Sequence, residues 1–270
     1  MAIKVLINGA AGRMGRRLCC LAAEDEHMQL VGGLERVESP SIGKSLKELE
    51  PLLQCGDDIR LHSNLSDVSP QPDVIVDFSA PAASMKLAEE AASKGIALVI
   101  GTTGLTEEED KKLHSHSAKV PMIHAMNYSL GVNLVFRLSA DIAKALGDDF
   151  NIEIVEGHHN RKVDSPSGTA FGIADAVCAA TGRTRADLVH GRSGQVGKRT
   201  RREIGMHAIR LGSIVGDHTI HFGSDFERIE LTHKAQDRDV FAAGALRAAK
   251  WLAGKPPALY DMQDVLFGGK

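Results

Sequence analysis

The chain has 270 residues, of which 43% are hydrophobic and 25% charged, and 32 basic against 35 acidic residues leave a formal net charge of −3. These values are typical of a globular protein and exclude a disordered chain or one that coats nucleic acid with a basic surface. Aromatic residues make up only 4%, which argues against nucleic-acid recognition by base stacking. The length allows one large or two modest domains, and we expect two.

Two compositional features bear on location and on metal binding. The four cysteines do not form a C-x-x-C spacing, so we interpret them as reduced thiols rather than metal ligands. The sequence contains no run of about 20 uninterrupted apolar residues, and its first residues lack a charged leader followed by an apolar segment. We therefore expect a cytoplasmic protein that neither enters a membrane nor binds nucleic acid.

The first half alternates short apolar runs with helical patterns, which is typical of a parallel sheet with helices on both faces. The expected strands are residues 3–8, 28–34, 73–78, 96–100 and 121–125, and the expected helices are residues 13–24, 82–94 and 106–118. Residues 39–72 contain several prolines and glycines and are expected to form a connection. The pattern predicts an α/β fold with a Rossmann-like, doubly wound parallel sheet.

After Tyr128 the pattern changes, and we expect a second, α+β domain built on a mixed open sheet. Its expected helices are residues 130–146 and 167–181, and its expected strands are residues 150–157, 203–211, 214–222 and 226–233, the last three forming consecutive antiparallel pairs. Residues 191–202 are rich in glycine and basic residues, which suggests an exposed, mobile loop. A final helix at 240–253 is expected to return to the first domain. The predicted domains are 1–129 completed by 236–270, and 130–235.

A glycine-rich turn follows the first expected strand. It runs Gly9-Ala10-Ala11-Gly12-Arg13-Met14-Gly15 and opens the first helix, an arrangement that lets the backbone approach a pyrophosphate. A tight strand-to-helix turn is the alternative interpretation. Glu35 ends the second strand where an acidic residue would meet the adenosine ribose, and Arg36 could accept the 2′-phosphate of NADP. We predict a dinucleotide site that uses NADH, NADPH or both.

Two more segments lie at the carboxyl ends of expected strands, where open α/β sheets bind ligands. They are Gly101-Thr102-Thr103 and Ala125-Met126-Asn127-Tyr128. We predict that both segments contribute to the cofactor site.

A segment rich in histidine and lysine follows the strand expected at 150–157. His158 and His159 can exchange protons near neutral pH, and Lys162 can neutralise an anion. A helix expected to begin after Ser167 or Gly168 would turn backbone amides toward a carboxylate or phosphate. The segment therefore predicts an acidic substrate and a proton-transfer reaction.

The remaining candidates receive structural interpretations. Glu156 and Asp164 are expected to orient the neighbouring histidines rather than to react. Six other histidines lack the clustered carboxylates or cysteines of a metal site, and we expect them to be structural or exposed; they are His124, His190, His207, His218, His221 and His233. No bound metal is expected.

Five motifs in fixed order resemble one family of enzymes. They are GAAGRMG, LER, GTTG, HHNRKVDSPSGTA and WLAGKPPALYDMQDVL, and together they resemble the 4-hydroxy-tetrahydrodipicolinate (dihydrodipicolinate) reductases of diaminopimelate and lysine biosynthesis. The resemblance implies NAD(P)H-dependent reduction of a cyclic dicarboxylate, a nucleotide-binding domain formed by both chain ends, and a homotetramer built through the open sheet of the other domain.

The resemblance also implies roles for single residues. His158 would be the general acid/base and Lys162 a second proton-handling and charge-stabilising group. His159, Ser167, Gly168 and Thr169 would bind the substrate. The chain departs from the family at Ser165, where alanine is usual. Two alternatives remain open: a redox-sensing dinucleotide-binding regulator, and a reductase of an amino-acid-like imine.

Overall fold

The computed structural model describes residues 2–51 and 53–268, which fold into two compact units. Unit 1 comprises residues 1–129 and 241–270, and unit 2 comprises residues 130–240. The chain thus returns from unit 2 to unit 1 between residues 240 and 241, whereas the sequence suggested a boundary between residues 235 and 236. Among the described residues, no helix has the length and apolar character needed to span a membrane.

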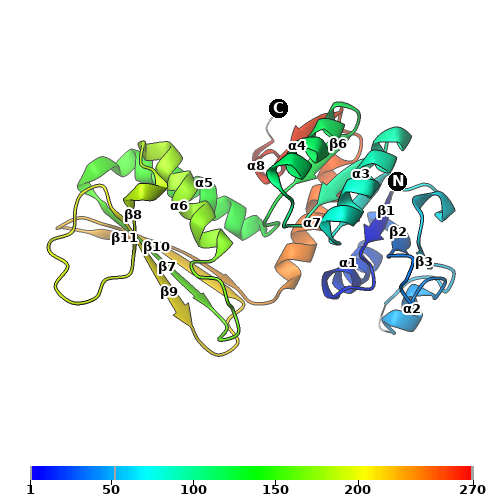
Figure 1. The fold of residues 1–270 in the computed structure, drawn as a ribbon, viewed down its shortest axis with the longest axis horizontal. Coiled ribbons are helices and arrows are strands. Elements are labelled where there is room, and N and C mark those ends of the chain that lie inside the picture. Colours follow the sequence, from blue (N-terminus) through cyan, green and yellow to red (C-terminus); the bar gives the residue numbers. More distant parts are fainter. Residues whose placement is uncertain (1, 52, 269–270) are drawn as a thin grey trace. The chain divides into compact units, whose positions relative to one another are not determined.

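Unit 1 is built on a seven-stranded sheet with the order β12-β6-β5-β4-β1-β2-β3, of which Figure 1 labels β1, β2, β3 and β6. All of its strand pairs are parallel. The strands are β1 (Ile3–Asn8), β2 (Met28–Leu34), β3 (Leu61–His62), β4 (Val74–Asp77), β5 (Ala97–Ile100), β6 (Pro121–His124) and β12 (Ala258–Tyr260). The strand order reverses direction at β1, as a doubly wound sheet requires, so the predicted fold class is confirmed.

The helices of unit 1 follow the predicted alternation. They are α1 (Arg13–Glu24), α2 (Leu46–Leu49), α3 (Pro81–Lys94), α4 (Glu107–Ser115), α7 (Asp239–Leu252) and α8 (Met262–Phe267), with 3-10 turns η1 (Leu65–Asp67) and η2 (His116–Ala118). Thr106 begins α4 as the expected cap, with its side chain accepting a hydrogen bond from the Glu109 amide. The region 39–72 is not only a connection, because it contributes α2, β3 and η1.

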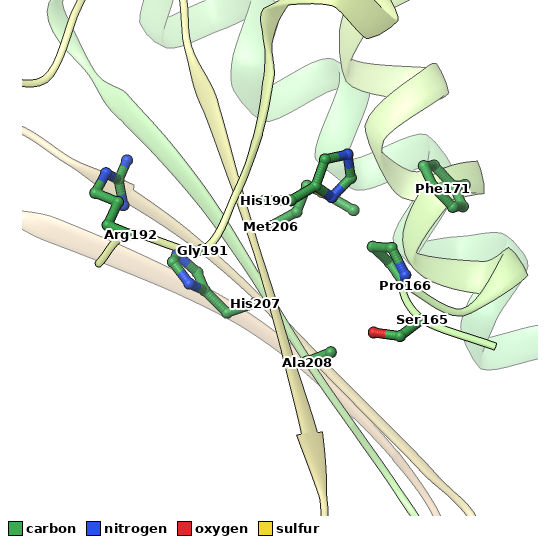
Figure 2. A pocket seen from close by; sticks show the side chains of 9 residues that line it. All are labelled: Ser165, Pro166, Phe171, His190, Gly191, Arg192, Met206, His207 and Ala208. Atoms are coloured by element: carbon green, nitrogen blue, oxygen red, sulfur yellow. The ribbon is translucent and has the colours of Figure 1, made fainter. Parts of the chain in front are cut away.

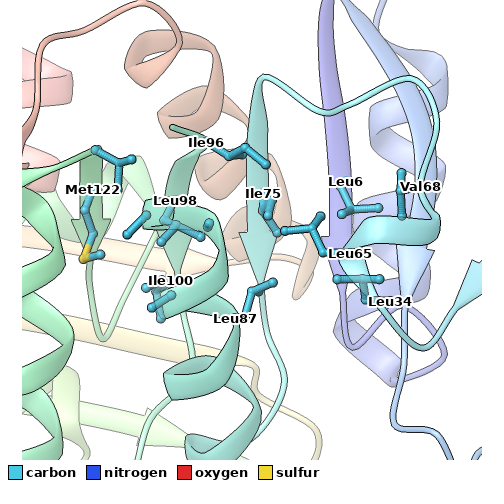
Figure 3. Close-up of a cluster of buried hydrophobic side chains, with 14 of the residues drawn as sticks. Leu6, Leu34, Leu65, Val68, Ile75, Leu87, Ile96, Leu98, Ile100 and Met122 are labelled. Carbon is cyan, nitrogen blue, oxygen red and sulfur yellow. The ribbon is translucent and has the colours of Figure 1, made fainter. Parts of the chain in front are cut away.

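The sequences of these strands are nearly continuous runs of apolar residues because the strands lie in the core of unit 1. Leu6, Ile75, Leu98 and Ile100 are fully buried on the central strands and pack with residues of α3 (Figure 3). A parallel sheet covered by helices on both faces has no solvated side, so its strands cannot alternate apolar and polar residues.

Unit 2 has a five-stranded mixed sheet with the order β11-β10-β7-β9-β8. Its elements are α5 (Leu130–Leu146), η3 (Gly147–Asp149), β7 (Asn151–His158), α6 (Gly168–Thr181), η4 (Arg185–Asp187), β8 (Leu188–His190), β9 (Ile204–Arg210), β10 (Gly216–Gly223) and β11 (Arg228–Ala235). Even-numbered residues of β7, such as Ile152 and Ile154, are buried in the core shared with α5 and α6. Odd-numbered residues face away from that core, as in a sheet with one open face.

One predicted pairing in unit 2 is wrong. The strands at 203–211 and 214–222 were expected to pair as an antiparallel hairpin, but β9 pairs with β7 in parallel and β10 lies on the opposite side of β7. Only β10 and β11 form the expected antiparallel pair. The turn composition indicates that the chain reverses direction, but it does not determine which strands then pair. In the structure, β7 pairs with β9 along one edge and with β10 along the other.

Candidate active site

The C-terminal end of β7 places His158 beside a buried carboxylate. Glu156 and His158 are two residues apart on the strand, so both side chains lie on the face that carries α5 and α6. His158 Nδ1 lies 2.6 Å from Glu156 Oε2, and Glu156 is completely buried. Because a carboxylate there accepts the Nδ1 hydrogen, His158 Nε2 is left as the nitrogen that can exchange a proton with a ligand.

Three further donors hold Glu156 in its ionised form. Arg210, which pairs with His158 across the β7–β9 register, donates to the two Glu156 oxygens at 2.9 and 2.8 Å. The Ser167 amide donates to Oε1 at 3.1 Å. Burial raises the pKa of Glu156, but the hydrogen bonds from Arg210 and His158 outweigh it and bring the pKa below its usual value. Glu156 thus contacts His158 directly, as an orienting carboxylate would.

His218 belongs to the same cluster, although the sequence pattern suggested only a structural or exposed residue. It pairs with Glu156 across the β7–β10 register, and its ring lies edge-on to His158 with centroids 5.3 Å apart. Its Nε2 lies 3.2 Å from Ser167 Oγ. Burial, followed by the neighbouring His158, lowers the pKa of His218 to about 4, so the ring is neutral at neutral pH. The sequence alone does not show that His218 lies beside His158, because this contact depends on the register between β7 and β10.

The segment after β7 supplies the remaining candidates. Lys162 Nζ is 2.8 Å from Asp164 Oδ1, and this contact lowers the pKa of Asp164. Asp164 therefore pairs with Lys162 and does not orient a histidine side chain as expected. The charge of Lys162 contributes, as the smallest of several causes, to the lowered pKa of both His218 and His159.

His159 lies outside the buried cluster but next to basic groups. Its Nε2 is 3.5 Å from an Arg238 nitrogen, while its Nδ1 is buried without a partner among the described residues. Desolvation, followed by the charges of Arg161 and Arg238, lowers the pKa of His159. A neutral imidazole among cations can join them in binding an anion through a ring N–H.

Helix α6 begins where the sequence predicted. Ser167 is the N-cap, and its Oγ accepts a hydrogen bond from the Ala170 amide at 3.1 Å. Gly168 and Thr169 form the first turn, and a Cβ on Gly168 would meet open space. Because Glu156 contacts both His158 and the Ser167 amide, the structure brings His158 to the positive end of the α6 helix dipole.

The glycine turn after β1 has the geometry of a phosphate-binding loop. Gly9 has φ of +75°, and a Cβ there would lie 2.7 Å from the Phe78 carbonyl oxygen. A Cβ on Gly15 would overlap the Gly9 carbonyl, so α1 packs closely against the turn. Gly12 caps α1 without a side-chain hydrogen bond, which leaves the amide end of the helix without an internal anionic cap.

Glu35 and Arg36 follow β2 beside this turn. The Ala11 amide donates to Glu35 Oε2 at 3.3 Å, so the carboxylate reaches the loop as the ribose-binding prediction requires. Arg36 is exposed, and its amide donates to Glu35 Oε1 at 3.1 Å.

The two other predicted cofactor segments contain both buried and exposed residues. Thr102 Oγ1 accepts from the Ser79 amide and lies 3.2 Å from Asp77 Oδ2, and the fully buried Tyr128 hydroxyl donates to the Ile100 carbonyl at 2.8 Å. These two side chains therefore stabilise the fold. Met126, in contrast, is 84% exposed.

A buried polar group that sequence reasoning missed lies behind these loops. Asp77 ends β4 and is completely buried, with hydrogen bonds from Asn8, Ser79 and Ser84. Burial raises the pKa of Asp77 in spite of these donors. The network joins the ends of β1 and β4 and so fixes the position of the glycine turn.

A hollow in unit 2 lies elsewhere. It has a volume of about 580 Å³ and is formed by α6, β8, β9 and the segment before α6 (Figure 2). Its lining residues are Ser165, Pro166, Phe171, His190, Gly191, Arg192, Met206, His207 and Ala208. None of the predicted catalytic or substrate-binding side chains lines it, so it does not mark the cluster around His158.

The prediction that the other histidines lack neighbouring carboxylates is wrong for His124 and His207. His124 was expected to lack a neighbouring carboxylate, but its Nδ1 lies 3.0 Å from Asp110 Oδ1. Helix α4 brings Asp110 to β6, a contact that no local spacing in the sequence indicates. His207 similarly lies 2.7 Å from Glu153 Oε2 on the open face of the unit 2 sheet.

Comparisons with known proteins also divide the chain near residue 130, although the second matched model runs past unit 2 into the last part of unit 1. A family model described as "Dihydrodipicolinate reductase, N-terminus" matches residues 3–128, and one described as "Dihydrodipicolinate reductase, C-terminus" matches residues 131–266. A solved structure titled "Dipicolinate bound Dihydrodipicolinate reductase from Paenisporosarcina sp. TG-14" is similar, with a TM-score of 0.78 at 24% identity, and the match covers 98% of this chain and 99% of that one. At this identity the likeness establishes the fold.

Full-length sequence relatives carry the family assignment. A 4-hydroxy-tetrahydrodipicolinate reductase of Syntrophotalea carbinolica is 47% identical over 266 residues, covering 98% of both chains. One of Myxococcus xanthus is 44% identical over 269 residues, covering 98% of this chain and 97% of its own. Since the two models also account for both units of the structure, the chain belongs to the dihydrodipicolinate reductase family of oxidoreductases.

Proposed function

We propose that this protein reduces 4-hydroxy-tetrahydrodipicolinate to tetrahydrodipicolinate in diaminopimelate and lysine biosynthesis, with NADH, NADPH or both as reductant. The arrangement of Glu156, His158 and Lys162 at the start of α6 carries the proposal, because it joins a proton donor to an anion-binding helix end. The names of the full-length relatives point to the same reaction.

The substrate is a ring with two carboxylates, and unit 2 offers a suitable set of cations and amides. Lys162 would leave Asp164 and pair with a substrate carboxylate. His159 and the first turn of α6, with Ser167, Gly168 and Thr169, would donate hydrogen bonds to it. In this arrangement most binding energy comes from charge-assisted hydrogen bonds, which suits an acidic ligand.

The cofactor would be held by unit 1. The glycine turn fits a pyrophosphate, because a side chain at Gly9 or Gly15 would collide with the backbone and because α1 has no side-chain cap. Arg13 and Met14 begin the helix that faces the phosphates. Glu35 would bind the adenosine ribose and Arg36 a 2′-phosphate, so both cofactors are accommodated.

Loss of water from the 4-hydroxy substrate gives the conjugated dihydrodipicolinate ring, and a dihydronicotinamide bound to unit 1 would supply a hydride to the conjugated carbon of that ring. The protein's task is then to place one proton on the neighbouring ring carbon and to stabilise the charge that forms in between. His158 Nε2 is the proton donor, while Glu156 stabilises the imidazolium through Nδ1 and keeps the ring oriented. Lys162 and the α6 amides hold negative charge on the nitrogen and carboxylates.

Steady-state kinetics with purified protein, each reduced cofactor and the cyclic substrate test this proposal through the loss of nicotinamide absorbance. His158→Gln is expected to lower kcat by about 100-fold or more with a smaller change in KM, because it removes general acid catalysis. Lys162→Ala is expected to lower kcat and raise KM, because Lys162 contacts the substrate before and during the reaction.

His27→Gln is the control, since His27 is an exposed histidine of unit 1 beside Glu26. Its rates should equal those of the unmodified protein. Unchanged turnover in His158→Gln would remove this residue from proton transfer. Cofactor oxidation with an amino-acid-like imine in place of the cyclic dicarboxylate would favour the other reductase, and binding of cofactor without any turnover would favour the regulator.

The assembly we propose is a homotetramer in the cytoplasm. In support, helices α5 and α6 cover one face of the unit 2 sheet, and the other face carries half-exposed side chains such as Val155 and Thr219. An uncovered sheet face of this kind can be covered by other copies of the chain. Light scattering of the purified protein measures the subunit number.

A further inference from the structure

A cluster of three side chains in unit 1 has no part in the proposed reaction. Asp110 and His114 lie one turn apart on α4, and His124 ends β6. Asp110 Oδ1 lies 3.0 Å from His124 Nδ1 and 3.4 Å from His114 Nε2. The two ring nitrogens are 3.1 Å apart. One carboxylate oxygen and two imidazole nitrogens therefore converge on a single point.

These separations match the edges of a metal coordination shell. Zinc binds histidine nitrogen and carboxylate oxygen at about 2.0–2.2 Å in a tetrahedron, in which neighbouring ligand atoms lie about 3.3 Å apart. The three distances of 3.0, 3.1 and 3.4 Å bracket that value. The three atoms are therefore spaced as the ligands of one ion would be.

A backbone contact fixes which ring nitrogen of His124 faces the cluster. Its Nε2 lies 3.2 Å from the Thr102 carbonyl oxygen, and only an N–H there makes the contact favourable. In the neutral ring Nδ1 then carries a lone pair, and it lies 3.0 Å from the Asp110 carboxylate oxygen and 3.1 Å from His114 Nε2. Two acceptors at this distance repel each other unless a proton or a metal ion lies between them. A hydrogen bond from metal-bound histidine to a carbonyl is also the usual outer-shell arrangement.

We propose that Asp110, His114 and His124 bind Zn²⁺ or a similar divalent transition metal. Two imidazoles and one carboxylate favour such an ion over Mg²⁺ or Ca²⁺, which prefer oxygen ligands. The side chains of Asp110 and His114 are 39% and 31% exposed, so an ion can enter and keep a water molecule as fourth ligand. The ion would link α4 to β6 and, through His124, to the Thr102 loop.

Metal binding to the full-length protein, freed of metal with a chelator, tests the site. Co²⁺ should bind with tetrahedral absorption bands, and Zn²⁺ should displace it. Asp110→Asn and His114→Gln should each weaken this Co²⁺ affinity by about 10-fold or more, because each removes a direct ligand. His27→Gln is the control, since His27 is an exposed histidine in the same unit beside Glu26, and its affinity should not change.

A stability measurement distinguishes this site from metal bound at other histidines. Zn²⁺ should raise the Tm of the unmodified protein and of His27→Gln, and it should not raise that of Asp110→Asn or His114→Gln. Co²⁺ bands that persist in both cluster variants would overturn the proposal. So would an NMR spectrum in which His124 carries two ring protons at neutral pH while Zn²⁺ is present. The test does not depend on the reductase activity.

Discussion

His218 is a buried imidazole beside His158, and burial lowers its pKa from 6.5 to about 4. In the unfolded chain this ring takes up a proton as the pH falls below about 6.5, whereas the folded protein resists protonation until about 4. The contribution of His218 to stability is therefore complete above pH 6.5 and is lost as the pH falls toward 4. An NMR titration of its ring signals should give a midpoint near 4.

His218→Asn identifies these signals and removes the titrating group. Its free energy of unfolding should depend less on pH between 6.5 and 4 than that of the unmodified protein. His190→Asn changes an exposed histidine of the same unit and should leave the pH dependence unaltered. A His218 signal that titrates near 6.5 would show that Ser167 and the surrounding residues do not exclude water from the ring.

At the scale of elements, the packing of α1 on the β1 turn depends on one missing side chain. A Cβ on Gly15 would overlap the Gly9 carbonyl oxygen, so Gly15→Ala must push α1 away from the turn. The expected cost is about 1–3 kcal/mol of unfolding free energy, typical of overpacking. The affinity for NADH should fall as well, because the amides of α1 move from the phosphates. Denaturant unfolding and NADH titration by calorimetry measure the two effects.

Gly223→Ala is the matched control for this prediction. Gly223 ends β10, its φ is not in the left-handed region, and a Cβ there would meet open space. Stability and NADH affinity should both stay close to those of the unmodified protein. Normal NADH affinity in Gly15→Ala would mean that the position of α1 does not determine phosphate binding.

At the scale of the whole molecule, the elements with strong local signals were predictable from the sequence. The five strands expected in the first half and the long helix at 130–146 correspond to observed elements, because each is an apolar run or an amphipathic pattern within one segment. Short strands at the sheet edges were missed, namely β3, β8 and β12. Strands of two or three residues carry too little pattern to stand out from loops.

The candidate site was predictable where its residues are adjacent in sequence. His158, Lys162 and Ser167 lie in one segment, and the cap at Ser167 follows from its local chemistry. His218 and Arg210 come from β10 and β9, and their approach depends on strand register and on the parallel pairing of β7 with β9. Long-range pairing of this kind leaves no mark in local composition, and Asp110 beside His124 is a second example.

The open face of the unit 2 sheet carries an ion network that should govern acid stability. Glu153 accepts hydrogen bonds from Arg192 at 2.9 and 3.0 Å, from Arg199 at 2.9 Å and from His207 at 2.7 Å. The two arginines belong to the exposed 191–202 segment, so their hydrogen bonds to Glu153 connect that loop to β7. Partial burial raises the pKa of Glu153, but these donors outweigh it and bring the pKa to about 2.

The pH dependence of unfolding follows from this shift. The unfolded chain protonates Glu153 near 4.5, while the folded protein holds the carboxylate ionised down to about 2. The stabilisation is therefore complete above pH 4.5 and is lost as the pH falls toward 2. Glu153→Gln should be less stable than the unmodified protein at pH 7, and the difference should shrink below pH 4.5. Urea unfolding at fixed protein concentration measures it, with Glu26→Gln on the surface of unit 1 as control. A constant difference across this range would mean that the ion pairs of Glu153 add no net stability.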